Sequence, residues 1–231
     1  MYGVTIGEKH SQKDFGLILT ARVISPPVPK VNRAEVPLRD GTIDLTASLS
    51  DEVKFEDRTI TMTFAVVDPI KNWSSKVSEI QNYLHGKRMK VIFDDDLAFY
   101  YHGRVSVNSW TSDRTIGKLV IECVVDPFKY DVTSSAVDWE WDTFDFEEGI
   151  INEMGQLVVN GATTIKLICR RKRMYPTITA STAMTMSYNG EIYNLLPGSQ
   201  RFYDLFLCEG ENELTFTGNG TISIDYIGGS L

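Results

Sequence analysis

Short apolar runs separated by turn residues recur along this chain of 231 residues. The segment Arg58–Val67 alternates, with Ile60, Met62 and Phe64 on one side and threonines on the other. A period of two residues is typical of a half-buried β-strand. Further strands of the first half are expected at Phe15–Ile24, Met89–Phe93, Leu97–Tyr101, Arg104–Trp110 and Lys118–Val125, the last four forming two hairpins across Asp94–Asp96 and Thr111–Gly117.

One segment has the period of a helix instead. Its apolar residues are Trp73, Val77, Ile80 and Leu84, spaced i, i+4, i+7 and i+11. Asn72 precedes them as an N-cap candidate, and Gly86 follows as a C-terminal stop. We expect one helix whose apolar stripe packs on the neighbouring sheet.

The second half predicts many short strands and no helix. The Asn189–Gly190 pair indicates a two-residue hairpin, because Asn and Gly tolerate the positive φ angles of such turns. Gly218-Asn219-Gly220 marks another turn. The expected strands are Gln156–Val159, Thr164–Cys169, Thr177–Ala180, Met184–Tyr188, Glu191–Leu195, Asp204–Leu207, Glu213–Phe216 and Thr221–Tyr226. This pattern favours an antiparallel β-sandwich.

The strands therefore predict a mainly β protein of two domains, 1–133 and 134–231, which meet at Thr133-Ser134-Ser135. The length suits two domains of ordinary size. The net charge of −8 is uneven: residues 1–133 hold 17 basic and 18 acidic residues, whereas 134–231 hold 6 and 13. The two domains are thus expected to face different surroundings.

Composition narrows the function classes. An acidic chain repels phosphate backbones, so we expect no nucleic-acid partner. No apolar run approaches the ~20 residues of a membrane span, and no secretory signal opens the chain, so a soluble protein made in the cytoplasm is expected. Cys123, Cys169 and Cys208 lie in apolar runs and are expected to be reduced core thiols, with no metal or disulfide role.

Two acidic clusters are candidates for chemistry. Between Asp138 and Glu148, carboxylates alternate with aromatic residues, which is compatible with a glycosidase pair or with a charged edge strand; we favour the edge strand. Asp94-Asp95-Asp96 resembles a cation site but lacks the spacing of a calcium loop, so a polar turn is expected.

The remaining sequence offers no catalytic constellation. Recognisable nucleophile, zinc-protease and phosphate-loop motifs are absent, and the three histidines have no obvious carboxylate partner. The basic run Arg170–Arg173 is interpreted as a solvated strand end, with a nucleic acid, an acidic surface or the Asp138–Glu148 stretch as alternative partners. We expect no enzyme and no cofactor.

Aromatic residues of the second domain leave two interpretations open. They are Tyr175, Tyr188, Tyr193, Phe202, Tyr203 and Phe206. Such residues on one face of a β-sandwich stack on sugars, and the same residues fill β-sandwich cores. Tyr188, Tyr193 and Tyr203 are the glycan-facing candidates.

A proline-rich segment and several ordered motifs carry a family resemblance. Ser25–Lys30 holds three prolines, which indicates an extended arm, a crossing segment or a loop. It follows the apolar Phe15–Thr20 run and precedes Arg39-Asp40-Gly41. Farther along come Arg58–Phe64, the Val91–Asp96 hairpin with Tyr100–Val105, and a C-terminal pair at Gly210–Phe216 and Thr221–Tyr226. This order resembles the distal tail protein (Dit) family of long, non-contractile-tailed bacteriophages and prophages.

The resemblance implies a structural role in a virion. It implies an N-terminal ring-forming domain of β-sandwich type, with one helix and an extended arm, and a galectin-like or carbohydrate-binding-module-like C-terminal sandwich. Its implied partners are five other copies in a homohexamer, the tail tube protein, the tape measure protein, the tail-associated lysin or fibre, and the receptor-binding protein, all at the tail tip. Pro26, Pro27, Arg39 and Asp40 are the predicted ring contacts. The alternative function is binding of host cell-wall polysaccharide.

Overall fold

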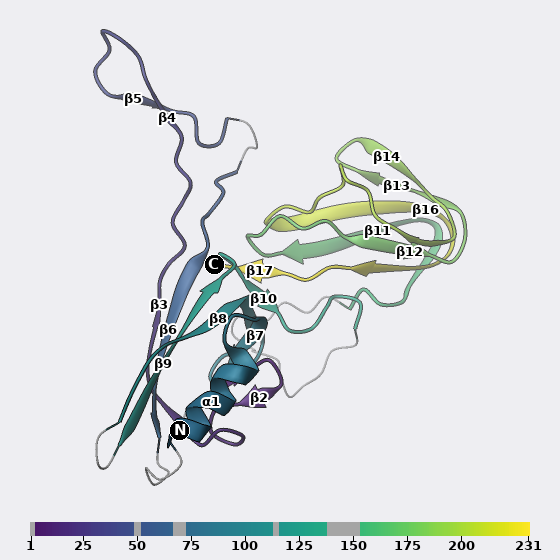
Figure 1. Cartoon of the computed structure of the whole chain (residues 1–231). Coiled ribbons are helices and arrows are strands. Elements are labelled where there is room, and N and C mark those ends of the chain that lie inside the picture. Colours follow the sequence, from purple (N-terminus) through teal and green to yellow (C-terminus); the bar gives the residue numbers. More distant parts are fainter. Residues whose placement is uncertain (1–2, 49–51, 67–72, 113–115, 138–152) are drawn as a thin grey trace. The chain divides into compact units, whose positions relative to one another are not determined.

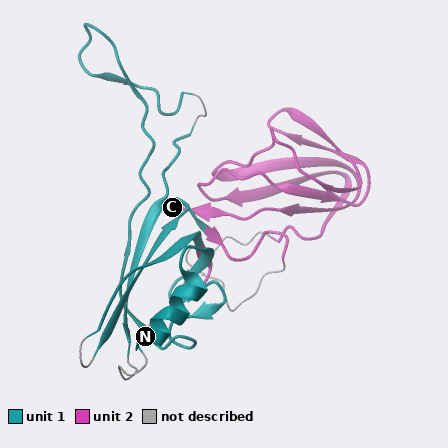
Figure 2. Ribbon diagram, viewed as in Figure 1, with its two compact units in different colours: residues 1–96, 101–129, 231 teal, residues 97–100, 130–230 magenta. Residues whose placement is uncertain are grey.

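The computed structural model describes residues 3–48, 52–66, 73–112, 116–137 and 153–231. As predicted, the fold is mainly β, with antiparallel sheets and one helix in the described residues. The chain divides into two compact units, 1–96 with 101–129 and 231, and 97–100 with 130–230 (Figure 2). The domain boundary expected after Thr133 stays a prediction.

The first unit is built on one antiparallel sheet (Figure 1). Its strands follow the order β2-β1-β7-β8-β9-β6-β3. Their bounds are β1 Val4–Ile6, β2 Lys9–His10, β3 Leu17–Ile24, β6 Arg58–Val66, β7 Arg88–Phe93, β8 Phe99–Ser112 and β9 Gly117–Val125. Strand β6 alternates buried and half-buried residues along its whole length, which confirms the period read from its sequence.

Helix α1, Trp73–Leu84, supplies the other half of this core. The four residues predicted to form its apolar stripe are its four buried residues. They join Ile60, Met62, Phe64 and their neighbours in one hydrophobic cluster. Gly86 follows the helix at φ +80°, a left-handed conformation that glycine adopts without strain, so the predicted C-terminal stop is confirmed. Asn72 lies outside the described residues.

One part of the strand prediction is wrong. The segments Leu97–Tyr101 and Arg104–Trp110 are one continuous strand, β8, which pairs with β7 on one side and β9 on the other. Gly103 lies inside this strand. A glycine is needed there because the Cβ of any other residue would lie 2.1 Å from the Val124 carbonyl oxygen. The glycine therefore marks a close approach of two strands.

Residues 25–48 and 52–57 belong to an arm that leaves the sheet after β3 and returns at β6 (Figure 1). Its two legs are joined near the sheet by hydrogen bonds from Glu56 N–H to Val28 O (2.8 Å) and from Lys30 N–H to Lys54 O (2.8 Å). Its far end is a small hairpin of β4, Arg33–Glu35, and β5, Thr42–Asp44. For the proline-rich segment the sequence left an extended arm, a crossing segment and a loop open, and the structure shows the extended arm.

The second unit is built on β16, Gly210–Asp225, and β11, Leu157–Cys169, which pair along thirteen registered positions. On its other side β16 pairs first with β13 and then with β12. The remaining strands are β10 Lys129–Asp131, β12 Thr177–Ala180, β13 Met184–Tyr188, β14 Glu191–Leu195, β15 Gly198–Gln200 and β17 Gly229–Ser230. Tyr130 of β10 pairs with Tyr100.

Three expectations for this unit need correction. Gly218 and Gly220 lie inside β16 at φ +154° and +153°, and no turn interrupts the strand. A Cβ at Gly218 would lie 2.6 Å from the Met184 Cβ, so glycine allows the close approach of β16 to β13. The segments expected as two strands on each side of Gly161 are likewise one strand, β11. Asp204–Leu207 forms only an isolated bridge, from Leu207 to Met174. The Asn189–Gly190 hairpin is confirmed, with φ of 50° and 86°.

Candidate functional site

The arm carries all four predicted contact residues, in two separate places. Pro26 and Pro27 lie at its base, exposed and half-buried respectively, whereas Arg39 and Asp40 lie exposed in the loop between β4 and β5. Among the described residues of the arm, 25–48 and 52–57, none belongs to the hydrophobic cluster of the first unit. A ring-contact role for the four residues stays a prediction.

The loop at the far end of the arm, residues 36–41, is called the arm tip below. Leu38 stands there fully exposed with φ +68°, which costs a non-glycine residue about 1–3 kcal/mol. Further exposed apolar side chains line the arm at Val28, Val31, Val36, Leu45 and Val53. An arm that is apolar, exposed and strained at its tip has the properties of a docking element.

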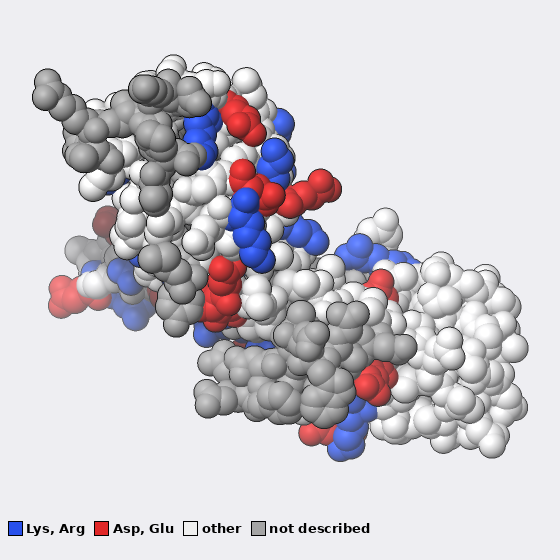
Figure 3. Space-filling model, turned by 90° about the horizontal axis from the view of Figure 1, so that it is seen from below, with Lys and Arg blue, Asp and Glu red and all other residues white. Residues whose placement is uncertain are grey.

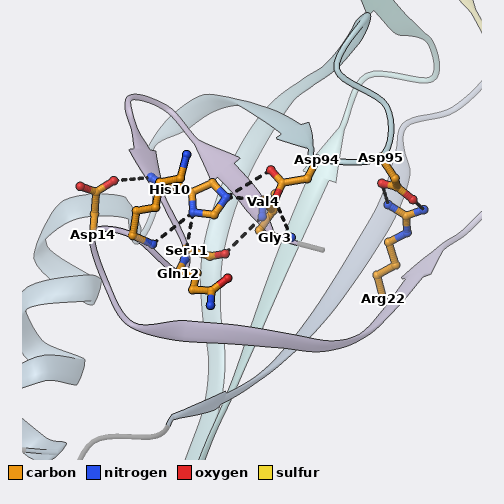
Figure 4. Close-up of polar contacts among 10 residues, drawn as sticks. Gly3, Val4, His10, Ser11, Gln12, Asp14, Arg22, Asp94 and Asp95 are labelled. Atoms are coloured by element: carbon orange, nitrogen blue, oxygen red, sulfur yellow. Dashed lines mark hydrogen bonds and ion pairs between the residues drawn. The ribbon is translucent and has the colours of Figure 1, made fainter. Parts of the chain in front are cut away.

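An ion pair fixes the strand from which the arm starts (Figure 4). Arg22 of β3 donates two hydrogen bonds to the Asp95 carboxylate, at 2.6 and 2.5 Å. The Arg22 guanidinium also stacks on Phe93, 4.6 Å from the ring centroid. The hydrogen bonds from Arg22 lower the pKa of Asp95, so the pair is fully ionised near neutrality.

The other two aspartates of this turn are also engaged. Asp94 accepts hydrogen bonds from Gly3 N–H (2.8 Å) and from His10 Nε2 (3.1 Å), and Asp96 pairs with Lys129 Nζ (2.9 Å). Each carboxylate is therefore neutralised or hydrogen-bonded by the protein itself. In the described part of the chain, no group of three or more potential ligands is placed to hold a metal ion.

His10, Ser11 and Asp94 lie together, as the members of a hydrolase triad would (Figure 4). The contact between His10 and Asp94 corrects the expectation that the histidines have no carboxylate partner; His102 likewise lies 3.5 Å from Asp126. His10 Nδ1 accepts the N–H groups of Gln12 and Lys13, both at 3.2 Å, while Nε2 faces Asp94. Neither ring nitrogen is left to take a proton from Ser11, whose Oγ accepts the Val4 N–H instead.

The three tyrosines predicted to face glycans have different surroundings. Tyr188 and Tyr193 are 7% and 8% exposed and belong to the core of the second unit, whereas Tyr203 is 96% exposed. The Tyr188 hydroxyl donates to Asn212 Oδ1 at 2.6 Å. A glycan-facing role stays a prediction, and among the three only Tyr203 presents its ring to solvent.

Tyr175 and Phe206 form a second aromatic group, in an edge-to-face contact 6.2 Å apart. Arg173 stacks on Phe206 at 4.1 Å and Arg201 lies 6.0 Å from the Tyr175 ring. In the sequence of this unit, residues 154–165, 174–190, 192–200 and 214–224 contain no charged residue. Figure 3 shows the outer part of this unit as a broad area without Lys, Arg, Asp or Glu. Charge-free surface with exposed Tyr and Arg is typical of binding faces.

The basic run Arg170–Arg173 is divided between two places. Arg170 pairs with Asp131 (3.3 Å) and stacks on Phe99, and Lys172 lies over Tyr130 at 4.1 Å. These contacts hold together segments of the second unit that are far apart in sequence. The acidic stretch Asp138–Glu148, expected to be an edge strand, lies outside the described residues.

Sequence reasoning missed a pocket of about 340 Å³ on the first unit. Its lining residues are Asp57, Arg88, Arg104, Ser106, Val124 and Asp126. They come from the base of the arm, from β7, β8 and β9, and from Asp126 directly after β9, with Arg88 opposite Arg104 in the β7–β8 register. Extending the predicted hairpin, in which Phe93 lies opposite Leu97, pairs Arg88 with His102 instead. The observed register is shifted by two residues, so the sequence alone did not show this pair of arginines.

No model of a known protein family matches the chain, and no curated protein matches its sequence. Among solved structures, it is similar to the crystal structure of SPP1 Dit (gp 19.1), described as a paradigm of the hub adsorption apparatus in phages that infect Gram-positive bacteria. The TM-score is 0.66, the identity is 13%, and the match covers 100% of both chains. The resemblance to distal tail proteins is thereby confirmed at the level of the fold. No helix in the described residues is long and apolar enough to cross a membrane.

Proposed function

We propose that this chain is a structural, non-enzymatic component of the adsorption apparatus at the tip of a phage tail. In this proposal six copies form a ring that joins the tail tube to the tail-associated lysin or fibre and to receptor-binding proteins. The observation that carries it is the end-to-end fold similarity to the SPP1 hub protein, since both units and the arm are included in a match covering each chain completely.

The arm supports assembly through the first unit. Its described residues, 25–48 and 52–57, add none to the hydrophobic core of the first unit, and ordering a backbone costs roughly 1–2 kcal/mol of entropy per residue. Its exposed apolar side chains recover free energy only when something covers them. An arm that contacts a neighbouring copy gives a head-to-tail interface, and such interfaces close into rings when the rotation between copies is a fraction of a turn.

The first test is the mass of the purified full-length chain in solution. Mass photometry and light scattering are expected to find a hexamer that shifts to smaller species on dilution. A chain that stays monomeric at high concentration would contradict the ring.

Variants then test whether the arm makes the ring. Leu38→Asp is expected to dissociate the hexamer, because it places a charge where apolar burial is expected. Leu196→Asp is the matched control: this leucine is also exposed, but it lies in the second unit. An equal loss of assembly in both variants would show that the arm is not the contact.

A second candidate function is binding of host cell-wall polysaccharide by the second unit. The exposed Tyr203 ring and the contact of Tyr175 with Phe206 favour it, because sugars stack on aromatic faces. Calorimetric titration of the full chain with wall polysaccharide tests it. Binding that is lost in Tyr203→Ala and Tyr175→Ala supports this function, whereas no heat in the wild type removes it.

A further inference from the structure

The pocket between Arg88 and Arg104 has an unusual charge arrangement. Like charges directly opposite each other on paired strands destabilise a sheet, yet Arg88 faces Arg104. Arg88 Nη2 has a carboxylate partner, Asp126 Oδ1, at 3.0 Å. The described protein offers Arg104 only the Gly86 carbonyl oxygen, which accepts from Nη1 at 2.5 Å. Most of the five N–H donors of Arg104 therefore remain for a ligand.

The pocket fits a carboxylate better than a phosphate. A guanidinium fork binds either anion with two hydrogen bonds. Asp57 and Asp126 also line the pocket, however, and they repel a doubly charged anion more strongly than a single carboxylate. Val124, 45% exposed, adds an apolar surface. The matching ligand is a polypeptide segment that carries a carboxylate beside an apolar side chain.

The arm tip is such a segment. Leu38, Arg39 and Asp40 present an apolar, a basic and an acidic side chain in succession, all exposed. The pocket offers the complementary set, with Val124 for Leu38, Asp57 for Arg39, and Arg104 for Asp40. No hydrogen bond within the described residues occupies the Asp40 carboxylate.

The arm tip that reaches this pocket is that of another copy of the chain. Asp57, at the base of the arm, lines the pocket, so the pocket adjoins the end of the arm opposite to its tip. The leg from Ser25 to Val36 spans roughly 35 Å at about 3.3 Å per residue. This length exceeds the radius of gyration of a domain of this size, about 13 Å. An extended arm therefore carries its tip away from its own pocket and toward a neighbouring molecule.

We propose that the pocket lined by Arg88, Arg104 and Val124 receives the arm tip of a second copy, with Asp40 of that copy bound by Arg104. This inference rests on the proposed ring and names its contact. Because the tip and the pocket lie at opposite ends of one arm, each copy both gives and receives a tip, as a ring requires.

The test is a charge exchange in the full-length protein. Arg104→Asp and Asp40→Arg are each expected to raise the concentration of half-assembly about tenfold or more, because each places like charges in contact. The double variant R104D/D40R restores an opposite pair in every interface and is expected to recover most of the assembly. Lys118→Asp reverses the charge at an exposed site of the neighbouring strand β9; it is the matched control and is expected to assemble normally. Circular dichroism melting checks that all four variants fold.

The outcomes separate the two proposals. A wild-type hexamer that R104D leaves intact overturns the pocket contact while the ring stands. Single variants that dissociate without rescue in the double variant overturn the pairing of Asp40 with Arg104. A wild-type monomer at high concentration overturns both the ring and its contact.

Discussion

Replacing Arg22 by Met is expected to lower the free energy of unfolding of the first unit by about 1 kcal/mol at pH 7. The change removes two hydrogen bonds to Asp95 and the stacking of the guanidinium on Phe93. Both charged side chains are about one-third exposed, so solvent screening keeps the ion pair near the ~0.2–1 kcal/mol of surface pairs. The stacking contact adds roughly 0.5 kcal/mol.

The effect should depend on pH with a definite sign. Arg22 holds the pKa of Asp95 below its ordinary value, so the folded state binds the proton of this carboxyl less tightly than the unfolded chain does. The ion pair therefore contributes its full stability above the unfolded pKa of about 3.9, and this contribution is lost as the pH falls through the lower, folded pKa. The difference between wild type and R22M is expected to shrink below about pH 4.

Urea unfolding at pH 7 and at acid pH measures this difference. In a background where Trp139 and Trp141 are replaced by Phe, tryptophan fluorescence reports the first unit through Trp73 and Trp110, which lie 6.2 Å apart. Arg22→Lys keeps the charge but loses the two-pronged hydrogen bond, and is expected to fall between wild type and R22M. An equal loss at both pH values would refute the electrostatic reasoning, and no loss at either would show that the pair does not stabilise β3.

Three further predictions concern thiols and the second unit. Cys208 is exposed, which corrects the expectation that it is a core thiol, whereas Cys123 and Cys169 are buried as predicted. A thiol reagent is expected to label only Cys208 in the native protein and all three cysteines after denaturation, because burial raises the pKa of Cys123 to about 12 and that of Cys169 to about 11; native labelling of two or more would contradict this. Gly218→Val is expected to destabilise the second unit by about 2 kcal/mol or more, because its Cβ would collide with Met184, and thermal melting should show a lower midpoint. An unchanged midpoint would show that β16 tolerates a side chain at this position. Asn212→Ala removes the partner of Tyr188 and of the Cys208 backbone and is expected to cost about 3 kcal/mol in urea unfolding, whereas a cost under about 1 kcal/mol would mean that water replaces the amide.

The sequence predicted correctly those elements that depend on residues close together in the chain. Helix α1 was found because four apolar residues at helical spacing bury one stripe, and the Asn189–Gly190 turn because both residues tolerate positive φ. The glycines of β8, β11 and β16 misled the prediction for a tertiary reason. Gly103 and Gly218 are required by the approach of another strand, and a single sequence does not show that neighbour.

The polar contacts were hidden for a related reason. Asp94 lies 84 positions from His10, and Asp95 lies 73 from Arg22. Such pairs depend on how the sheet brings distant strands together, so residue spacing alone left the histidines without partners and the aspartates resembling a cation site. Burial separated the tyrosines in the same way, since Tyr188 and Tyr203 were predicted to share one role yet lie at opposite extremes of exposure.

The energetics of the arm connect the fold with the proposed assembly. In the isolated chain, the described part of the arm is extended, exposes Leu38 in a strained conformation and adds no residue to the core of the first unit. Each of these is a cost to the monomer, and a free energy of folding of only about 5–15 kcal/mol leaves little room for such costs. The pocket shows a second imbalance, because Arg88 faces Arg104, and of the two only Arg88 is bonded to a carboxylate in the described residues. One contact between tip and pocket relieves both imbalances, since it covers the apolar tip and gives Arg104 its anion. The arm tip and the pocket each carry a cost in the monomer, and each supplies the side chains that relieve the cost of the other. Binding between copies of this chain therefore accounts for both.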